Sequence, residues 1–551
     1  MTRTFGGRRA ATGVLQLSQQ KFQWVMRSAF GHQADTCSLL REGETCWRTG
    51  TATRATLLVD GAEYFAVLRQ ALLQAREQIL IAGWDFDSRI LLPPAPGEEP
   101  GEAPLQLGEL LGYLVRTRPG LQIHVARWDY HWMYRADREA DTRQQLTRRG
   151  VHFYEYSDHP WAACVHHKIV VIDDVLAFCG GIDLTHDRWD TSQHAPGDRR
   201  RIDTSGRPYM PVHDTQLCVA GPIATQLGEY LRAGWPAPAV LPPRAAPAQL
   251  WPEGLRVEFE NIRTGIARTV PASSDSPAAR EIEAFYLAAV GATQRCMYLE
   301  NQYFTSPRIA RAILDRCTHA SNIEGVLVGM DAPKTPAELH TMGYGLRRFR
   351  KLLAEGEVEN RVPLMTALSD DGRCINMHSK LAIFDDRWLT VGSANLNRRS
   401  MGLDIECNLV LEATETEHRR QIEQLRTRLL AEHVASEPQT LAAQIALHGV
   451  VAAIGRAGGN RRLERFRRLP REPVLGPMLA PLFDRDDVLI PDALRAGRWE
   501  FALPLERLLE RRNAYEDRAS GAAHRERSAQ AVRRHGARSV LFDRGIGTTR
   551  S

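Results

Sequence analysis

The sequence predicts an α/β fold, made of two similar α/β/α sandwich domains that pack face to face about a pseudo-twofold axis and share a site at their interface. The chain has 551 residues, which is too long for one ordinary domain. A motif of the form H-x-K-x4-D occurs twice, beginning at His166 and again, 212 residues later, at His378. The segments around both copies alternate helix patterns with strand patterns in the same order, which indicates an internal repeat.

The first matched element in each half is a helix pattern that runs directly into a strand pattern. It reads FAVLRQALLQAREQILIAGWDFDS at 65–88 and REIEAFYLAAVGATQRCMYLENQYFTS at 280–306. A second strand pattern follows, LQIHVARWDY at 121–130 and IEGVLVGMDAP at 323–333. Helices that alternate with strands favour an α/β sandwich in each half.

The motif strands come next along the chain. They read CVHHKIVVIDD at 164–174 and NMHSKLAIFDD at 376–386. Each is followed by a turn of small residues, CGGIDL at 179–184 and VGSANL at 391–396. Because side chains along a strand alternate in direction, the histidine and the lysine of each motif are expected on the same face.

A strand that carries an acidic residue closes each half. Asp214 lies 48 residues after His166, in HDTQLCVAGP, and Glu406 lies 28 residues after His378, in DIECNLVLE. An extra polar loop at 187–209 explains the longer spacing in the first half.

The repeat divides the chain into five expected parts. These are an N-terminal extension (1–37), a first repeat (38–250), a second repeat (251–435), a helical or irregular extension (436–510) and an Arg-rich, flexible tail (511–551). The polar composition of the tail predicts extended or disordered chain.

Composition bounds the class of protein and its compartment. Hydrophobic residues are 43% and charged residues 25%, so the chain can build real cores. The net charge of +5 is a mild basic bias that is compatible with an anionic substrate. Nine cysteines without a CxxC pair favour a reducing compartment. No signal peptide or transmembrane helix is evident, which predicts a cytoplasmic or peripheral membrane location.

The paired motifs predict a catalytic site for phosphate chemistry. Two lysines supply cations for an anionic phosphate, and two imidazoles with an ordinary pKa of about 6.5 can act as nucleophile and general acid. Asp214 and Glu406 are each expected to hold the Nδ1–H of a histidine, which leaves Nε2 toward the substrate. The predicted catalytic residues are His166, Lys168, His378, Lys380, Asp214 and Glu406.

The small-residue turns are the predicted substrate-binding elements, because backbone N–H groups and the Asn395 amide can donate to phosphoryl oxygens. The predicted binding residues are Gly180, Gly181, Asp183, Ser393 and Asn395. Asp183 stands where Asn395 stands in the second turn; a carboxylate would repel a phosphate, so its side chain is expected to point elsewhere. Asp173 and Asp385 lie ~17 Å along their strands from the histidines and are predicted to be structural.

Both motif copies, with the turns GGIDL and GSANLNRRSM, resemble the phospholipase D superfamily. Within it, GGIDLTHDRWD, LENQYF and MHSKLAIFDDRWLTVGSANLNRRSM are similar to the plant- and animal-type enzymes found also in bacteria, over about residues 38–415. The resemblance implies the phospholipase D fold, phosphodiester substrates and a covalent phosphohistidine intermediate, with His166 as nucleophile and His378 as acid. It also implies that the reaction needs no cofactor and no catalytic metal.

The leading functional prediction is a phospholipase D, which cleaves the distal phosphodiester of a glycerophospholipid to phosphatidic acid and an alcohol, with transfer to other alcohols. The alternatives are a cardiolipin synthase-like phosphatidyltransferase and a nucleic-acid phosphodiesterase. The modest positive charge does not favour nucleic acid, which needs a long basic groove with stacking aromatics. The expected partners are therefore a phospholipid substrate and a peripheral membrane surface. A monomer is expected to suffice, because both motifs lie in one chain.

Overall fold

The computed structural model describes residues 38–466, except 98, 100, 130–140, 158, 161–162, 237–239, 246–248, 274–276 and 332–335. The predicted N-terminal extension, the Arg-rich tail and the C-terminal extension beyond residue 466 lie outside the described residues. None of the helices in the described ranges has the length and apolar character that crossing a bilayer requires.

Strands and helices alternate through the first repeat as predicted. Its elements are β1 (Arg48–Val59), α2 (Asp60–Gln74), β2 (Gln78–Gly83), α3 (Leu107–Thr117), β3 (Gln122–Trp128), α4 (Thr142–Arg148), β4 (His152–Tyr156), β5 (Ile169–Ile172), β6 (Leu176–Gly180), β7 (Val212–His213), β8 (Thr215–Ala220) and α5 (Pro222–Ala233).

The second repeat follows the same plan and continues into three further elements. Its elements are β9 (Phe259–Val270), β10 (Ala279–Arg280), α6 (Glu281–Ala292), β11 (Cys296–Asn301), α7 (Pro307–His319), β12 (Glu324–Val328), α8 (Pro336–Glu355), β13 (Leu364–Leu368), β14 (Asn376–Met377), β15 (Lys380–Phe384), β16 (Trp388–Gly392), α9 (Arg398–Gly402), β17 (Glu406–Glu412), α10 (Thr416–His433), and then α11 (Pro438–His448), α12 (Val450–Arg456) and β18 (Arg462–Arg465).

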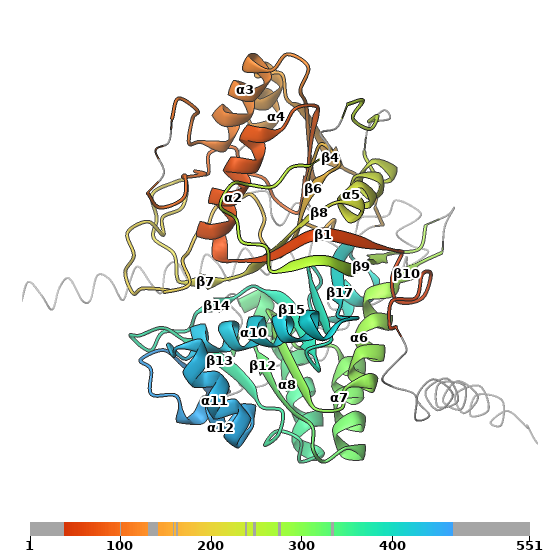
Figure 1. Cartoon of the computed structure of the whole chain (residues 1–551), viewed down its shortest axis with the longest axis vertical. Helices are drawn as coiled ribbons and strands as arrows, with labels where there is room; N and C mark the ends of the chain where they lie inside the picture. Colours follow the sequence, from red (N-terminus) through yellow and green to blue (C-terminus); the bar gives the residue numbers. More distant parts are fainter. Residues whose placement is uncertain are drawn as a thin grey trace, which may run out of the picture. The chain divides into compact units, whose positions relative to one another are not determined.

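One sheet of 16 strands runs through both repeats (Figure 1). Its order is β18-β13-β12-β11-β15-β16-β17-β9-β1-β8-β6-β5-β2-β3-β4, with β10 paired to β9. Read outward from the centre, the first repeat runs β1-β8-β6-β5-β2-β3-β4 and the second runs β9-β17-β16-β15-β11-β12-β13. The seven strands in each of these two series thus correspond one to one, and β10 and β18 are additional, which confirms the predicted α/β class and the internal repeat.

The two repeats join edge to edge, so the expected face-to-face packing is wrong. Strands β1 and β9 pair antiparallel at the centre of the sheet, from Arg48 opposite Ile266 to Ala55 opposite Phe259 (Figure 1). Each of these 12-residue strands would otherwise be an open edge with unpaired N–H and C=O groups. Their pairing satisfies those groups, and it places the two repeats about an axis that passes between β1 and β9.

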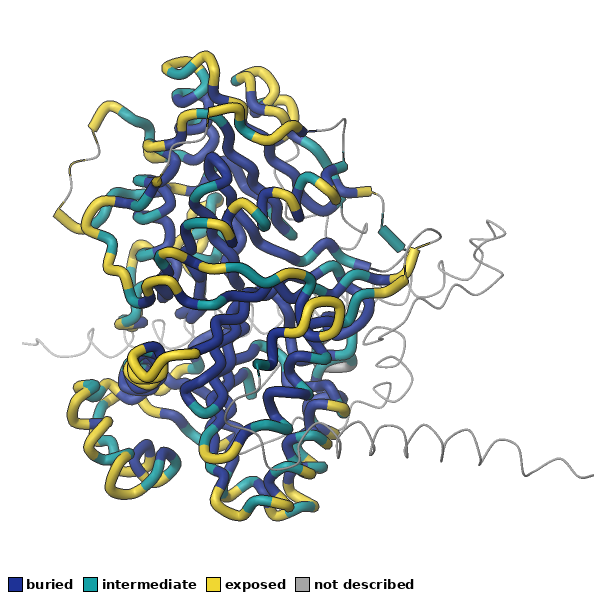
Figure 2. The backbone as a smooth tube through the Cα atoms, turned by 45° about the vertical axis from the view of Figure 1, so that its right-hand side comes forward, coloured by how far each residue is buried: buried dark blue, intermediate teal, exposed yellow. Residues whose placement is uncertain are grey.

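Helices cover both faces of the sheet and supply the core. In the first repeat α2 buries Phe65, Leu68 and Leu72 at helical spacing against one face. A second core continues through both repeats and includes Leu227 of α5 and Leu429 of α10. Figure 2 shows buried chain in the interior and most of the exposed chain at the outside. At roughly 1.5–3 kcal/mol for each fully buried large apolar side chain, these layers are the main source of stability.

The motif aspartates tie the turns after β5 and β15 to the neighbouring strands. Asp173 and Asp385 both adopt positive φ, 52° and 51°, which an Asp tolerates in a tight hairpin turn. Their carboxylates accept backbone N–H groups at the starts of β2 and β11. The donors are Arg76, Glu77 and Gln78 for Asp173, and Gln294, Arg295 and Cys296 for Asp385.

Candidate active site

The motif histidines lie just ahead of the strands in which they were expected. Strand β5 begins at Ile169, after His166 and Lys168, and β15 begins at Lys380, after His378. The offset arises because the chain pairs with the other repeat at these positions before it joins its own part of the sheet.

Backbone hydrogen bonds across the two repeats hold each histidine. The N–H of His166 donates to the carbonyl of Ile405 at 2.8 Å, and the N–H of His378 donates to the carbonyl of His213 at 2.8 Å. The short strands β7 and β14 pair in parallel next to the second contact. Each motif is therefore placed beside the acidic strand of the opposite repeat.

The histidine–carboxylate pairs consequently cross between the repeats. His166 Nδ1 lies 3.0 Å from Glu406 Oε2, and His378 Nδ1 lies 2.6 Å from Asp214 Oδ2. Both carboxylates are buried. Each pair occupies the Nδ1 of its ring and leaves Nε2 for a substrate. In sequence Asp214 follows His166 and Glu406 follows His378, so the spacing does not show which carboxylate holds which ring.

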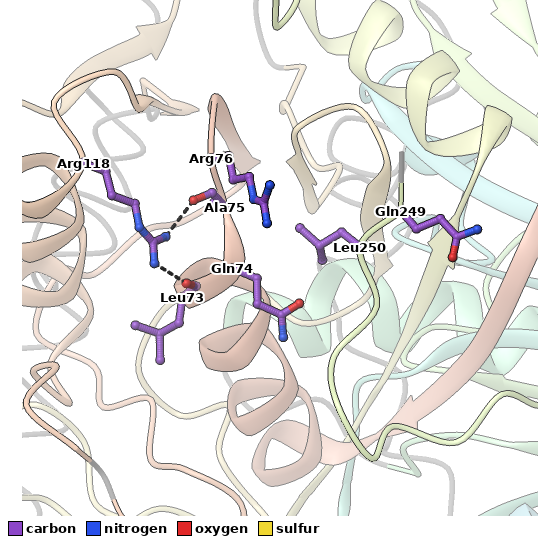
Figure 3. A pocket seen from close by; sticks show the side chains of 7 residues that line it. All are labelled: Leu73, Gln74, Ala75, Arg76, Arg118, Gln249 and Leu250. Carbon is purple, nitrogen blue, oxygen red and sulfur yellow. Dashed lines mark hydrogen bonds between the residues drawn. The ribbon is translucent and has the colours of Figure 1, made fainter. Parts of the chain in front are cut away.

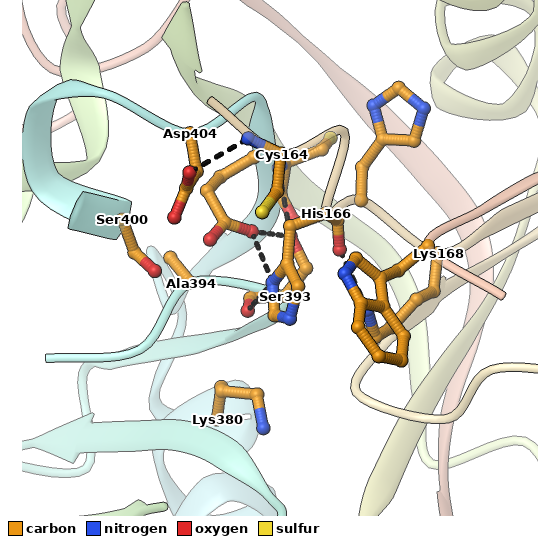
Figure 4. Close-up of polar contacts among 12 residues, drawn as sticks. Cys164, His166, Lys168, Lys380, Ser393, Ala394, Ser400 and Asp404 are labelled. Atoms are coloured by element: carbon orange, nitrogen blue, oxygen red, sulfur yellow. Dashed lines mark hydrogen bonds and ion pairs between the residues drawn. The ribbon is translucent and has the colours of Figure 1, made fainter. Parts of the chain in front are cut away.

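The two motif lysines are buried beside the histidines, and Lys380 lies close to the ring of His166 (Figure 4). Lys168 Nζ donates to the carbonyl of His166 at 2.8 Å, and Lys380 Nζ donates to the carbonyl of His378 and to Gln302 Oε1, the latter at 3.3 Å. Both ammonium groups are thus fixed relative to the backbone of their own motif.

Asp183 is the partner of Lys168. Its Oδ2 lies 3.1 Å from Lys168 Nζ, and its Oδ1 accepts the N–H groups of Trp84 and Asp85. Both oxygens are engaged by the protein, so the side chain orients the lysine and does not face a phosphate.

The small-residue turns pack directly against the two carboxylates. Ser393 Oγ donates to Glu406 Oε2, and the Ser393 carbonyl lies 3.1 Å from His166 Nδ1 (Figure 4). At the matched position, a Cβ on Gly181 would stand 2.0 Å from Asp214 Oδ1, so only glycine fits there. A Cβ on Gly180 would likewise meet the carbonyl of Thr215 at 2.4 Å.

Asn395 differs from the other predicted binding residues. Its side chain is buried, and among the described residues no hydrogen-bond partner meets its Oδ1. Because the oxygen and nitrogen of an amide are assigned from the hydrogen-bond network, this end of the side chain is available to a ligand in either orientation.

Burial controls the ionisation of the site. Burial, with the positive charges of Lys168 and Lys380, holds the pKa of His166 well below its usual range. Burial raises the pKa of Glu406 and that of Asp214 to about 7, and it lowers the pKa of Lys380 to about 7. A neutral imidazole at His166 has the free lone pair that a nucleophile needs.

Two further residues of the site lie at matched strand ends that carry no motif. Trp84 follows β2, and its ring packs edge-on against His166 with centroids 6.4 Å apart. Gln302 follows β11 and accepts from Lys380. The only sequence signal for them is their position after equivalent strands in the stretches GWDF and ENQY, since residues at strand ends commonly carry function.

A surface cavity elsewhere in the first repeat has no part in this site. It has a volume of about 430 Å³ and is lined by residues 73–76, Arg118, Gln249 and Leu250 (Figure 3). The Arg118 guanidinium donates to the carbonyls of Leu73 and Ala75, so its hydrogen-bonding capacity is largely used within the protein.

Known proteins match a large part of the chain, and a domain family matches the part that carries the second motif. The domain family described as "Cardiolipin synthase, PLD-like domain" matches residues 286–426, which include His378, Lys380 and Glu406. Phospholipase D1 of Saccharomyces cerevisiae is 24% identical over 462 residues, which is 65% of this chain and 27% of the yeast protein. Cardiolipin synthase B of Salmonella typhi is 24% identical over 379 residues, which is 66% of this chain and 77% of that protein. These matches confirm the resemblance of the chain to the phospholipase D superfamily.

The names of these superfamily relatives divide between two activities, hydrolysis and phosphatidyl transfer. Phospholipase D2 of Bos taurus is 22% identical and aligns with 67% of this chain and 50% of its own length. The chain thus spans half or less of the two named phospholipases D. Among solved structures, phosphatidylserine synthase of Haemophilus influenzae aligns with 73% of this chain and 95% of its own, at 14% identity and a TM-score of 0.47.

Activity is expected to fall as the pH drops below about 7, because Glu406 must be ionised to accept the Nδ1–H of His166. Burial raises the pKa of Glu406 to about 7, so the carboxyl takes up a proton as the pH falls through that value. The measurement is kcat/KM for a phosphodiester between about pH 5 and 9. Because the pKa of Asp214 is also raised to about 7, Glu406→Gln removes one of two ionisations that shape this acid limb, so the limb of its residual activity should become less steep. An acid limb of unchanged steepness in the variant would assign it to other groups.

Proposed function

We propose that the protein is a phospholipase D that hydrolyses the distal phosphodiester of glycerophospholipids to phosphatidic acid and an alcohol, and that also transfers the phosphatidyl group to other alcohols. The observation that supports it is the pair of crossed dyads, His166 with Glu406 and His378 with Asp214, beside two buried lysines. This arrangement offers two imidazole Nε2 atoms and two cations to one phosphodiester.

In the first step, Nε2 of His166 attacks phosphorus and forms an N–P bond. The bond from phosphorus to the alcohol oxygen breaks, and that oxygen takes the Nε2 proton of His378. Lys168, Lys380 and the Asn395 amide hold the non-bridging oxygens, whose negative charge grows in the transition state. Asp214 stabilises the protonated form of His378 before the proton leaves, as its 2.6 Å contact with Nδ1 allows.

In the second step, His378 is neutral and takes a proton from water, whose oxygen attacks phosphorus. The N–P bond to His166 breaks, and the phosphatidic acid leaves. Two inversions give net retention at phosphorus. Any alcohol that reaches the same position can replace water, so transfer follows from the same geometry as hydrolysis.

The test is a competition between substrate classes. Phosphatidylcholine vesicles with added ethanol are expected to yield choline, phosphatidic acid and phosphatidylethanol, whereas a single-stranded oligonucleotide stays intact. Mass spectrometry of the lipid products and gel analysis of the oligonucleotide measure both outcomes. Cleavage of the oligonucleotide without turnover of the lipid would overturn the lipid assignment.

A cardiolipin synthase-like transferase is the second candidate, because the matching domain family and Cardiolipin synthase B carry that name. Vesicles of phosphatidylglycerol without another alcohol distinguish the two. A transferase converts them mainly to cardiolipin and glycerol, whereas the proposed hydrolase yields mainly phosphatidic acid and glycerol.

A further inference from the structure

A second cluster of buried titratable side chains lies next to the active site and uses none of the motif residues. Its members come from four separate elements of the chain. Asp60 begins α2, His194 lies in the extra polar loop at 187–209, His213 ends β7, and Glu432 lies in the last turn of α10.

One nitrogen of each imidazole lies close to carboxylate oxygens of Asp60 and Glu432. His213 Nδ1 lies 3.1 Å from Glu432 Oε1 and 3.3 Å from Asp60 Oδ1. His194 Nε2 lies 3.3 Å from Glu432 Oε1 and 3.7 Å from Asp60 Oδ2. Four ligands at about 2.0–2.1 Å from a tetrahedral zinc ion lie ~3.3 Å from one another. The four His–carboxylate distances lie around this value, and each residue offers a ligand atom within 4.8 Å of the others, so the residues can close on one ion.

These atoms lie at ion-pair distance from one another, but not in the alignment of a good hydrogen bond. Asp60 Oδ2, His194 Nε2, His213 Nδ1 and Glu432 Oε1 are all buried, and within the described ranges none has a hydrogen-bond partner of acceptable geometry. A buried polar atom left without a partner costs about 1–3 kcal/mol. Four in one place indicate that the atoms face a common centre.

The second nitrogen of each imidazole is held by another carboxylate. His194 Nδ1 lies 3.0 Å from Asp190 Oδ2, and His213 Nε2 lies 3.1 Å from Glu300 Oε2. Arg201 in turn donates to Asp190 at 2.9 Å. A carboxylate behind the ring is the usual support of a metal-bound histidine, because it orients the ring and strengthens the ligand nitrogen.

The backbone at two of the four residues has positive φ. Asp60 has φ of 66° and His194 has φ of 46°, a left-handed conformation that is uncommon for residues other than glycine. Such conformations persist where surrounding interactions over-determine them, and they cluster at functional sites.

We propose that Asp60, His194, His213 and Glu432 bind a divalent transition-metal ion, zinc before others, in a structural role. Two imidazoles and two carboxylates are a donor set that suits zinc, whereas magnesium and calcium take oxygen ligands. The competing account is a metal-free network in which both histidines are protonated. Burial by itself would lower the pKa of His194, but the carboxylates of Asp60, Asp190 and Glu432 raise it to about 9, so two imidazolium ions would supply the same positive charge as one divalent ion.

The metal would position the acid dyad without touching the phosphate. The carbonyl of His213 accepts the N–H of His378, and the next residue, Asp214, holds the ring of His378. Asp60 and Asp214 exchange two hydrogen bonds. The N–H of Asp60 donates to the carbonyl of Asp214 at 2.8 Å, and the N–H of Asp214 donates to Oδ1 of Asp60 at 3.1 Å. An ion at this point therefore connects the 187–209 loop and α10 to the strand that carries Asp214. Its role leaves intact the expectation that the chemistry at phosphorus needs no metal.

The first measurement is the metal content of the intact protein, purified without chelators from cells grown with zinc. We expect a single zinc ion per chain by elemental analysis. Glu432→Gln and His194→Ala should lose most of it, and His418→Gln should keep it. His418 is a matched control because it is buried and hydrogen-bonded, to the carbonyl of Glu260, yet lies outside the cluster. Full zinc content in both cluster variants would overturn the proposal.

The second measurement uses only the wild-type chain, so it does not depend on the folding of a variant. Removal of the metal with a strong chelator is expected to lower the Tm, and added Zn²⁺ should restore it, because an ion that binds only the folded state stabilises it. Replacement by Co²⁺ should give the intense visible bands of a tetrahedral site. A wild-type chain that carries no zinc, and whose Tm responds to neither chelator nor Zn²⁺, would establish the protonated network in its place. Neither readout depends on which phosphodiester the enzyme cleaves.

Discussion

Replacing either motif histidine by alanine is expected to lower kcat for phosphodiester turnover by roughly 10⁴-fold or more, because each change removes a whole step of the mechanism. His166→Ala removes the nucleophile, and His378→Ala removes the acid and the later base. Each ring is held by its own buried carboxylate from the other repeat, so neither histidine can move to take the place of the other. The measurement is the release of choline from phosphatidylcholine vesicles under saturating conditions.

The matched control is His319→Ala, at an exposed position on α7 where the ring hydrogen-bonds to the carbonyl of Asp315 in its own helix. It is expected to keep the wild-type rate and Tm. Unchanged Tm in the two motif variants shows that the loss is chemical. Near-normal turnover in either folded motif variant would rule out the shared site.

The crossed histidine–carboxylate dyads predict a second large loss of activity, in which each carboxylate variant has the defect of the histidine variant in the other repeat. Asp214→Asn and Glu406→Gln should each lower kcat by up to ~10⁴-fold, because an amide cannot stabilise the imidazolium and favours the wrong tautomer. Asp214 lies in the first repeat but serves His378 of the second, and Glu406 serves His166. The Asp214 variant should therefore share the defect of His378→Ala, and the Glu406 variant that of His166→Ala.

A substrate with a nitrophenol leaving group separates the two pairs. Such a leaving group departs with little help from an acid, so the first step should recover in His378→Ala and Asp214→Asn. Rapid-mixing experiments should then show a burst of nitrophenol, followed by slow turnover while the phosphohistidine waits for a base. His166→Ala and Glu406→Gln should show neither recovery nor a burst. A burst in Glu406→Gln together with none in Asp214→Asn would mean that each carboxylate serves the histidine of its own repeat.

Local patterns in the sequence were sufficient for the fold class and for the residue types of the site. Strand alternation and the spacing of H-x-K-x4-D depend on a few neighbouring residues, so His166, Lys168, His378 and Lys380 could be singled out without coordinates. The repeated order of helices and strands indicated two matched α/β units, and the sheet has that symmetry.

The arrangement of those units was decided by contacts between residues far apart in the chain. Pairing of β1 with β9 made one continuous sheet, and the local sequence of neither strand predicts which strand it pairs with. The same long-range pairing set His166 beside Ile405 and His378 beside His213, and so exchanged the carboxylates between the repeats.

The sequence by itself therefore determined the candidate catalytic side chains, because a motif is a local property of the chain. Only the tertiary structure decided which carboxylate serves which histidine, that Asp183 pairs with Lys168, and that Asp60, His194, His213 and Glu432 meet. Those four residues span more than 370 positions and follow no motif spacing. They come together because sheet order and helix packing bring distant segments of the chain to one place. Both are driven by the burial of apolar faces, and the sequence of an apolar face does not specify which other face it will pack against.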